Sequence, residues 1–526
     1  MFYRVLSAAV YGLSVLPIFV ESDVSDGLPQ FIMVGCLSSQ VKEAENRVKA
    51  SFRNSDISLP PKRITVNLSP ADVPKSGSRF DLPIALSVLA SAGIIPHERL
   101  KNLMVVGELS LSGELKPVRG VLPITAKAKD LNLPAIMVPR ANEPEARTVA
   151  GIHVIGLSSL AEAVRYLKEN VIPERAPGAQ PEDLPESSYL RISGSAVSGS
   201  GFLHRNLCMS DIHGQNSAVR AAVISVAGFH NLLLIGPPGS GKTMIASRVP
   251  GILPALTEEE SLEIARIYSI AGLLPENDPV IRERPFRHPH HTITPQALAG
   301  GGKIPVPGEI TLAHRGVLFL DEFPEFSRSA LEILRQPLED REIVISRSGG
   351  TFRFPANFLL LAAMNPCPCG CYPDTNRCRC TPGDISRYMG KISRPLLDRI
   401  DLCADCPEVS YENLASGVKD NPSSTEILDM VSSARAIQAE RFRGTPLHFN
   451  SDIPARSVSE FCRLSSGAES MLSRIFDRLH LSARSYHRII RVSRTIADLS
   501  GSSSIFPEHL NEALFYRIID KKYWKF

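Results

Sequence analysis

A single phosphate-binding loop constrains the fold of this chain more than any other feature of its sequence. Residues 236–243 read GPPGSGKT. The run before the loop, 230–235, is short and apolar enough for a buried parallel strand, and residues 244–249 after it contain no helix breaker. Strand, glycine-rich turn and helix is the context in which this motif binds a nucleoside triphosphate. We therefore predict an α/β nucleotide-binding domain with a parallel sheet.

The residues of this loop predict both phosphate and magnesium binding. Glycines let backbone N–H groups converge on phosphate oxygens, which larger side chains would block. Lys242 supplies a cation for the β- and γ-phosphates, and the Thr243 hydroxyl can bind Mg²⁺. The candidate ATP-binding residues are Gly236, Pro237, Pro238, Gly239, Ser240, Gly241, Lys242 and Thr243.

A second apolar segment leads into two acids. Residues 317–320 (VLFL) run directly into Asp321 and Glu322. Open α/β sheets bind ligands at the carboxyl ends of their strands. Asp321 is therefore predicted to hold Mg²⁺ through water, and Glu322 to polarise the water that attacks the γ-phosphate. A strand that simply ends in solvated acids is the plainer alternative, which the phosphate-binding loop in the same domain disfavours.

Length and composition set mild limits. A chain of 526 residues is expected to form about three domains, and 43% hydrophobic with 21% charged residues fits globular domains. The net charge of +3 neither requires nor excludes a nucleic-acid partner. No apolar stretch approaches membrane-spanning length, so we expect a cytoplasmic protein without a membrane partner.

Residues 1–20 are predicted to form two strands joined by a turn rather than a signal peptide. Five of the ten cysteines lie between 367 and 380, which indicates a reducing compartment with a local thiol function.

The distribution of proline, glycine and serine suggests the domain limits. Residues 171–204 are rich in these residues and are predicted to be a flexible linker. The domains expected around it are 1–170, 205–408 and a helical region, 409–526, which begins at a polar break.

Several long motifs resemble the ComM/YifB group of magnesium-chelatase-like AAA+ proteins, almost from end to end. They are the phosphate-binding loop and the segments 307–326, 359–370, 394–402 and 482–499. The resemblance implies an α/β AAA+ core, a Lon-protease-like α+β N-terminal domain and a helical C-terminal lid. It also implies a ring, usually a hexamer of identical subunits, in which the neighbouring subunit completes each ATP site.

Three further site residues follow from this resemblance. Asn365 resembles the sensor that orients the lytic water, Arg399 the arginine finger that reaches the next subunit's γ-phosphate, and Arg484 the lid arginine that reports the nucleotide. Each has a plainer alternative: a strand-end cap for Asn365, an ion pair with Asp398 or Asp401 for Arg399, and a solvated helix position for Arg484.

Two groups of arginines are candidates for contact with phosphates of nucleotide or nucleic acid. The first shares one helical face and comprises Arg484, Arg488 and Arg491. The second lies in a predicted hairpin, 341–354, and comprises Arg341, Arg347 and Arg353. A lid face packed near ATP and an exposed edge hairpin are the alternatives.

The N-terminal region resembles the proteolytic domain of Lon-type proteases at residues 74–81 and 107–113. Aligned by these stretches, Arg79 occupies the position of the serine nucleophile and Leu122 that of the lysine base. Neither can do the chemistry. A shifted dyad is the disfavoured alternative, and its candidates are Ser76, Ser78 and Lys127. We expect a binding or assembly scaffold.

A cluster of cysteines is a candidate zinc site within the predicted insertion 367–380. The family resemblance favours Cys367, Cys369, Cys378 and Cys380 as ligands and leaves Cys371 as an extra thiol. Free or redox-active thiols are the alternative, and a contribution from Cys403 and Cys406 is a weaker idea. The histidine-rich run 288–291 is interpreted as a structural or nucleic-acid-facing insertion rather than a metal site.

Three functions compete. The first, implied by the resemblance, is an ATP-driven ring that acts on single-stranded or branched DNA and drives branch migration as incoming DNA recombines in natural transformation. The second is a chelatase-like remodelling ATPase, and the third an ATP-switched binding scaffold. The Lon-like domain favours the first over the second, and the presence of Glu322 and Arg399 disfavours the third. The expected cofactors are ATP, Mg²⁺ and, through the cysteines, Zn²⁺.

Overall fold

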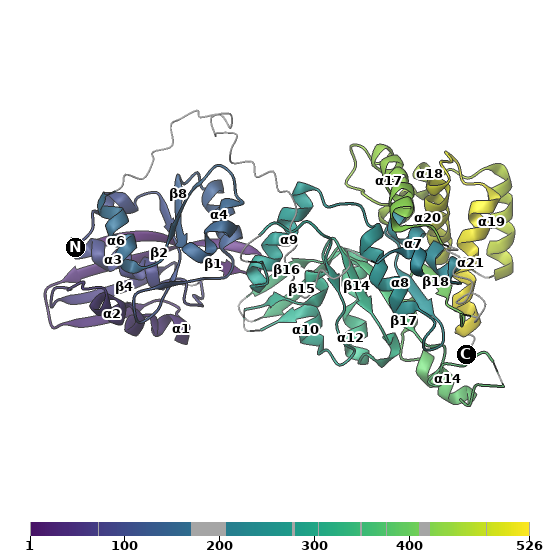
Figure 1. Cartoon of the computed structure of the whole chain (residues 1–526), viewed down its shortest axis with the longest axis horizontal. Coiled ribbons are helices and arrows are strands. Elements are labelled where there is room, and N and C mark those ends of the chain that lie inside the picture. Colours follow the sequence, from purple (N-terminus) through teal and green to yellow (C-terminus); the bar gives the residue numbers. More distant parts are fainter. Residues whose placement is uncertain are drawn as a thin grey trace.

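Three groups of elements follow one another along the long axis of the molecule (Figure 1). The computed structural model describes the residues 2–71, 73–169, 207–275, 279–302, 304–347, 350–374, 376–409, 421–479 and 481–524. They form an N-terminal α/β domain, a second α/β domain around a parallel sheet, and a set of C-terminal helices. The predicted linker, 171–204, lies outside the described residues, and the domain limits stay a prediction.

The chain begins with a long antiparallel hairpin, as predicted. β1 (Phe2–Tyr11) and β2 (Ser14–Ser25) pair from Phe2↔Asp23 to Tyr11↔Ser14. The hairpin belongs to a seven-stranded mixed sheet of order β3-β4-β2-β1-β5-β8-β9. The other strands are β3 (Gln30–Val34), β4 (Arg63–Ser69), β5 (Leu103–Val105), β8 (Ala135–Pro139) and β9 (His153–Leu157).

Helices cover this sheet, and one of them is wholly enclosed. Every residue of α3 (Asp81–Ser91) is buried, because the helix packs against the β1–β2 hairpin. The remaining elements are α1 (Ser39–Lys42), α2 (Ala44–Asn54), α4 (Val121–Asp130), α5 (Glu143–Arg147), α6 (Leu160–Glu169) and the small hairpin of β6 (Glu108–Leu109) and β7 (Leu115–Lys116).

The second domain contains the predicted parallel sheet. Its five strands have the order β11-β14-β17-β10-β18, and every neighbouring pair is parallel. They are β10 (Leu232–Ile235), β11 (Phe286–Arg287), β14 (Val317–Leu320), β17 (Leu359–Met364) and β18 (Leu402–Asp405). All carboxyl ends therefore lie at one edge of the sheet, with the buried strand β10 between β17 and β18. The predicted fold class is confirmed.

Short helices and two hairpins complete this domain. The predicted second hairpin is formed by β15 (Glu342–Arg347) and β16 (Gly350–Pro355), and a smaller one by β12 (Gly300–Gly301) and β13 (Val306–Pro307). The helices are α7 (Asn216–Gly228), α8 (Lys242–Arg248), α9 (Glu258–Ala271), α10 (Pro295–Ala299), α11 (Glu309–Leu312), α12 (Arg328–Ile333), α13 (Arg335–Asp340), α14 (Pro382–Met389) and α15 (Arg394–Leu397).

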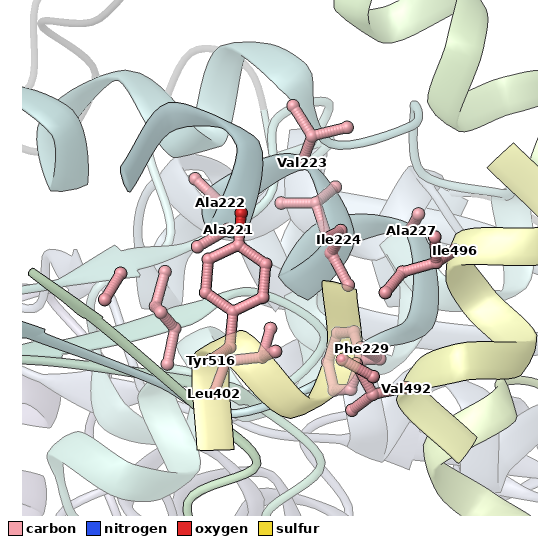
Figure 2. Packing of buried hydrophobic residues seen from close by; sticks show 14 of the residues in the cluster. Ala221, Ala222, Val223, Ile224, Ala227, Phe229, Leu402, Val492, Ile496 and Tyr516 are labelled. Carbon is pink, nitrogen blue, oxygen red and sulfur yellow. The ribbon is translucent and has the colours of Figure 1, made fainter. Parts of the chain in front are cut away.

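The C-terminal helices share one apolar core with the parallel sheet (Figure 2). They are α17 (Ser424–Arg441), α18 (Val458–Phe461), α19 (Ser466–Leu479), α20 (Ala483–Leu499) and α21 (Pro507–Tyr523). Val492 and Ile496 of α20 and Tyr516 of α21 pack near α7 in this core. The buried Asp498 carboxylate of α20 accepts hydrogen bonds from Arg441 of α17 at 2.7 Å and from Arg494 at 3.1 Å. Among the described residues, no helix combines the length and apolar character needed to cross a bilayer.

Candidate active site

The parallel register brings the predicted ATP-site residues together. Ile235 pairs with Met364 and Leu320 with Ala362, so the residues that follow β10, β14 and β17 meet at one edge of the sheet. The phosphate-binding loop follows β10, Asp321 and Glu322 follow β14, and Asn365 follows β17. This is the edge at which open α/β sheets bind ligands.

Lys242 is the buried cation of this site. Its Nζ donates to the carbonyl oxygens of Gly236 and Pro237 at 2.8 Å each, and its distance to the Asn365 Oδ1 is 3.3 Å. Burial lowers the pKa of Lys242, because removing an ammonium group from water disfavours the charged form. A phosphate anion would favour the charged form. Lys242 and Asn365 thus lie side by side next to the phosphate-binding loop.

The glycines have the conformations that a phosphate cradle requires. Gly239 and Gly241 have φ angles of +77° and +87°, which L side chains rarely adopt. A Cβ on Gly236 would lie 2.1 Å from the Cys406 carbonyl oxygen. Glycine is thus required by backbone conformation at 239 and 241 and by close packing at 236, and the residues present fit a bound nucleoside triphosphate.

Thr243 and Asp321, the predicted magnesium ligands, are in direct contact. The Thr243 Oγ1 donates to the Asp321 Oδ2 at 2.7 Å, and the other Asp321 oxygen accepts the Glu322 backbone N–H at 2.8 Å. Hydroxyl and carboxylate oxygens are the hard donors that Mg²⁺ prefers. The donor set therefore fits a magnesium ion bound to nucleotide phosphates.

His291 contacts the predicted catalytic acid, and the sequence did not identify this role. Its Nδ1 lies 2.9 Å from the Glu322 Oε2, and Glu322 has a left-handed backbone with φ of 51°. The contact follows from topology, because β11 pairs with β14 and the residues after both strands lie side by side. Only the order of strands in the sheet would have revealed it. His288 of the same run packs on the Phe319 ring with centroids 4.7 Å apart, as a structural role predicts.

Arg399 lies at the opposite edge of the sheet from its own phosphate-binding loop. It precedes β18, whose Leu402 pairs with Leu232 at the start of β10, and its carbonyl accepts a 2.9 Å hydrogen bond from Asn231. The four residues of β10 separate the two edges by roughly 13 Å. The alternative of an ion pair with Asp398 or Asp401 is wrong, because the Arg399 guanidinium pairs with Glu339.

Arg488 of the predicted lid contacts the segment that follows Arg399. Arg488 lies 3.4 Å from the Asp401 carboxylate and donates to the Ile400 carbonyl at 3.5 Å. Arg484 is exposed one helical turn earlier, near the start of α20. Burial lowers the pKa of Arg488 and of Arg491, so this face is less solvated than the sequence pattern indicated.

The four predicted zinc ligands form a compact sulfur group. The sulfur atoms of Cys367, Cys369, Cys378 and Cys380 all lie within 4.8 Å of one another. Individual separations are 3.4 Å for Cys367–Cys369 and 3.8 Å for Cys367–Cys378. Four thiolates around zinc at about 2.3 Å place sulfur atoms about 3.8 Å apart, so the geometry fits a tetrahedral zinc ion. A backbone hydrogen bond from Cys371 lowers the pKa of Cys369 to about 6.

The other cysteines do not belong to this group. The Cys371 thiol contacts the Cys369 carbonyl, as expected for an extra thiol. The idea that Cys403 and Cys406 join is wrong: Cys403 is buried within β18, and the Cys406 backbone packs against Gly236. The cysteine loop instead touches the phosphate-binding loop, since a Cβ on Gly370 would lie 2.4 Å from the Pro238 Cδ.

The two positions aligned with a Lon-type dyad are close together but carry no catalytic pair. A Cβ on Gly120, two residues before Leu122, would lie 3.8 Å from the Arg79 Nη1. Burial lowers the pKa of Arg79 to about 10, and its Nη1 has no hydrogen-bond partner among the described residues. The Ser78 hydroxyl donates to the Glu108 carboxylate rather than to an amine.

Comparisons with known proteins match the chain along most of its length. The family model described as magnesium chelatase, subunit ChlI, matches residues 208–414. The model of the C-terminal part of this subunit matches residues 421–517, and a further model of subunit ChlI matches residues 20–142. Competence protein ComM of Haemophilus influenzae is 41% identical over 98% of this chain and 97% of its own. YifB of Escherichia coli is 40% identical over 98% of this chain and 96% of its own. The maternal DNA replication licensing factor mcm6 of Xenopus tropicalis is 23% identical over 61% of this chain and 38% of its own.

Substitutions at Lys242 and Glu322 should separate binding from hydrolysis. Lys242→Ala removes the cation of the phosphate cradle and should weaken ATP binding by tenfold or more, on the order of a lost charge-assisted contact. Glu322→Gln keeps the shape of the site and should retain ATP affinity while turnover falls by about 10²-fold or more. Equilibrium binding of a labelled ATP analogue and steady-state ATPase rates check this, and equal affinity in the two variants would contradict it.

Removing one ligand should abolish metal binding, whereas removing the extra thiol should not. We expect about one zinc ion per chain in the wild type, retained in Cys371→Ser and lost in Cys367→Ser. Elemental analysis of protein purified under reducing conditions measures this. Equal zinc content in both variants, or none in the wild type, would favour free thiols.

Proposed function

The chain belongs to the ComM/YifB family of magnesium-chelatase-like AAA+ proteins, and from this premise we propose that it is an ATP-hydrolysing ring motor that acts on DNA in the cytoplasm. The task we propose is branch migration of recombining strands when incoming DNA is integrated during natural transformation. The relative from Haemophilus influenzae is named a competence protein, and the mcm6 relative a DNA replication licensing factor, which supports this direction.

The position of Arg399 is the main observation in support of a ring of subunits. Its side chain is separated from the phosphate-binding loop of the same chain by the length of β10. A guanidinium can stabilise transition-state charge only where it reaches the transferring phosphoryl group. We therefore propose that Arg399 serves the site of an adjacent subunit in a homo-oligomer, most simply a hexamer, and that Arg484 is the lid arginine that reports the nucleotide.

Within each site the chain's own residues divide the work. Lys242 would bind the terminal phosphates, and Asn365 would orient the attacking water without adding charge. Thr243 and Asp321 would hold the magnesium ion, which neutralises phosphate charge when it is bound. Glu322 would accept a proton from the attacking water. For this, its carboxylate would leave His291 and contact the water instead.

Two arginines of the β15–β16 hairpin support the choice of DNA as partner. Arg347 is exposed, and the Arg353 side chain is 68% exposed and pairs with Glu342. The third candidate, Arg341, is engaged elsewhere, because it pairs with Asp452 at 3.2 Å. Exposed arginines on a hairpin can contact phosphates without reading sequence, as a motor requires.

A chelatase-like remodelling ATPase is the second candidate, because the matching family models carry the description of a magnesium chelatase subunit. The two functions differ in what stimulates hydrolysis. We expect single-stranded or branched DNA to raise the ATPase rate, and Arg347→Ala with Arg353→Ala to reduce the salt dependence of DNA binding by about two charges. The matched control is Arg147→Ala, an exposed arginine of the N-terminal domain. An ATPase rate unaffected by any DNA would sink the DNA proposal.

Mixed subunits test the shared site. Lys242→Ala and Arg399→Ala each remove one half of it, so both should be inactive alone and partly active when mixed, because some interfaces then join an intact loop to an intact finger. ATP binding should survive better in Arg399→Ala than in Lys242→Ala. If subunits demonstrably exchange and activity stays at the level of the separate variants, Arg399 acts within its own chain or only in its ion pair with Glu339.

A further inference from the structure

The face of the N-terminal domain that would carry a Lon-type dyad is occupied by the AAA+ domain of the same chain. Leu122 of α4 is fully buried in an apolar cluster with Ile264 and Ala265 of α9 and with Ile281. Polar contacts surround this cluster. The Gly120 backbone N–H donates to the Ser269 carbonyl at 3.1 Å.

One carboxylate bridges the two domains. The Glu145 Oε1 accepts the Leu122 backbone N–H at 2.9 Å and the Ser269 hydroxyl at 2.6 Å. Ser269 is 2% exposed, and Glu145 is half-buried. The hydrogen bond from Ser269 to Glu145 disfavours separation of the two domains, because parting them would remove the partner of the buried Ser269 hydroxyl.

A second contact lies at the tip of the β1–β2 hairpin. The rings of Tyr11 and Phe352 have centroids 4.7 Å apart, and a Cβ on Gly12 would lie 3.0 Å from the Phe352 Cδ1. Leu13 packs into the same apolar cluster, which also contains Ile345. Figure 1 shows the N-terminal domain meeting the rest of the molecule at α9 and β16. We call the α4–α9 and Tyr11–Phe352 contacts together the interdomain dock.

The interdomain dock contacts the buried face of the β15–β16 hairpin, and the opposite face is exposed to solvent. Ile345 and Phe352 pair across the hairpin and are 8% and 4% exposed. Successive side chains of a strand point to opposite faces, so the Arg353 side chain next to Phe352 points to solvent. Fixing the buried face therefore sets the direction of the arginine that we propose for DNA contact.

The dock is also connected to the candidate ATP site. The Tyr268 hydroxyl of α9 donates to the Leu312 carbonyl of α11 at 3.1 Å. Glu309 of α11 pairs with Arg287 at 2.6 Å, at the end of β11. The next residues of the chain lead to His291, which contacts Glu322. A continuous set of contacts thus joins the N-terminal domain to Glu322, the predicted catalytic carboxylate.

We propose that the N-terminal domain is a positioning element for the β15–β16 hairpin, and that DNA contact at the hairpin stimulates ATP hydrolysis only while the interdomain dock is closed. The inference rests on the proposed DNA motor. It assigns to the altered dyad face an intramolecular partner, helix α9, in place of a peptide substrate. The domain then contributes to coupling and not to nucleotide binding.

Two variants open the dock at its two contacts. Leu122→Lys places a charge in the buried apolar cluster, and Tyr11→Ser removes the ring that faces Phe352. Their matched controls are Leu131→Lys, at a 40% exposed position just after α4, and Tyr3→Ser, at the far end of β1 from the dock. The controls alter the same domain without touching the AAA+ domain.

Hydrogen exchange and ATPase rates of the full chain are the readouts. Opening the dock should raise amide exchange in α9 and β16 by about tenfold or more, while the controls leave these segments unchanged. DNA stimulation of the ATPase should fall about fivefold or more, with ATP affinity altered less than about twofold. Exchange that stays at the wild-type level in both variants would overturn the dock. Raised exchange with undiminished DNA stimulation would overturn the positioning role.

The failure of the proposed function is distinguishable from the failure of this inference. If no DNA stimulates the wild type, the motor proposal fails and so does the coupling to DNA, whereas the exchange of β16 still decides whether the dock orders the hairpin. If DNA stimulates the wild type and the dock variants equally, the motor stands and the inference is wrong.

Discussion

The hydrogen-bonded register of four parallel strands, β14, β17, β10 and β18, governs the rest of this molecule. β10 lies between β17 and β18 and carries the phosphate-binding loop at its carboxyl end. The same register places Asp321 and Asn365 beside that loop and leaves Arg399 at the far edge. A single sheet thus places the phosphate-binding loop and Arg399 on two opposite edges. This separation is the basis for our proposal that two copies of the chain share each ATP site.

Burial of charge gives this arrangement its electrostatic character. Lys242 is withdrawn from water and is held by carbonyl oxygens, which compensate an ammonium group less well than an anion does. Arg399 is only 12% exposed and is held by Glu339. Both cations are therefore kept in place by acceptors that a phosphate anion could replace. In a preorganised site of this kind, little free energy is lost to reorganisation when negative charge develops on the phosphate in the transition state.

Sequence reasoning succeeded where the chemistry is local and failed where it depends on pairing between distant segments. The loop, the acids after β14 and the hairpin at residues 341–354 were predicted, because each is written in consecutive residues. The contact of His291 with Glu322 was missed, since it depends on β11 lying next to β14. The pairing of Arg399 with Glu339 was missed for the same reason, since 60 positions separate the two residues.

Proximity along the chain also misled. Cys403 and Cys406 follow Arg399 closely in sequence, yet β18 carries them into the sheet and away from the cysteine cluster. Arg488 and Arg491 were candidates for phosphate contact, but the helix turns them toward Asp401, just before β18. The resemblance to Lon-type proteases predicts that Arg79 and Leu122 occupy the dyad positions, and this stays a prediction. It gave no indication that helix α9 covers Leu122.

The tip of the first hairpin has a consequence for the order in which the chain is made. Tyr11 leaves the ribosome early, whereas Phe352, its ring partner, follows 341 residues later. At about 5–20 residues per second, the nascent N-terminal domain waits tens of seconds before the surface that covers its tip exists. The Leu122 face is covered sooner, because α9 follows it by only about 140 residues, that is, after roughly 7–30 seconds at the same rate. The two contacts of the dock therefore form at different times during synthesis, and the contact at the hairpin tip closes second.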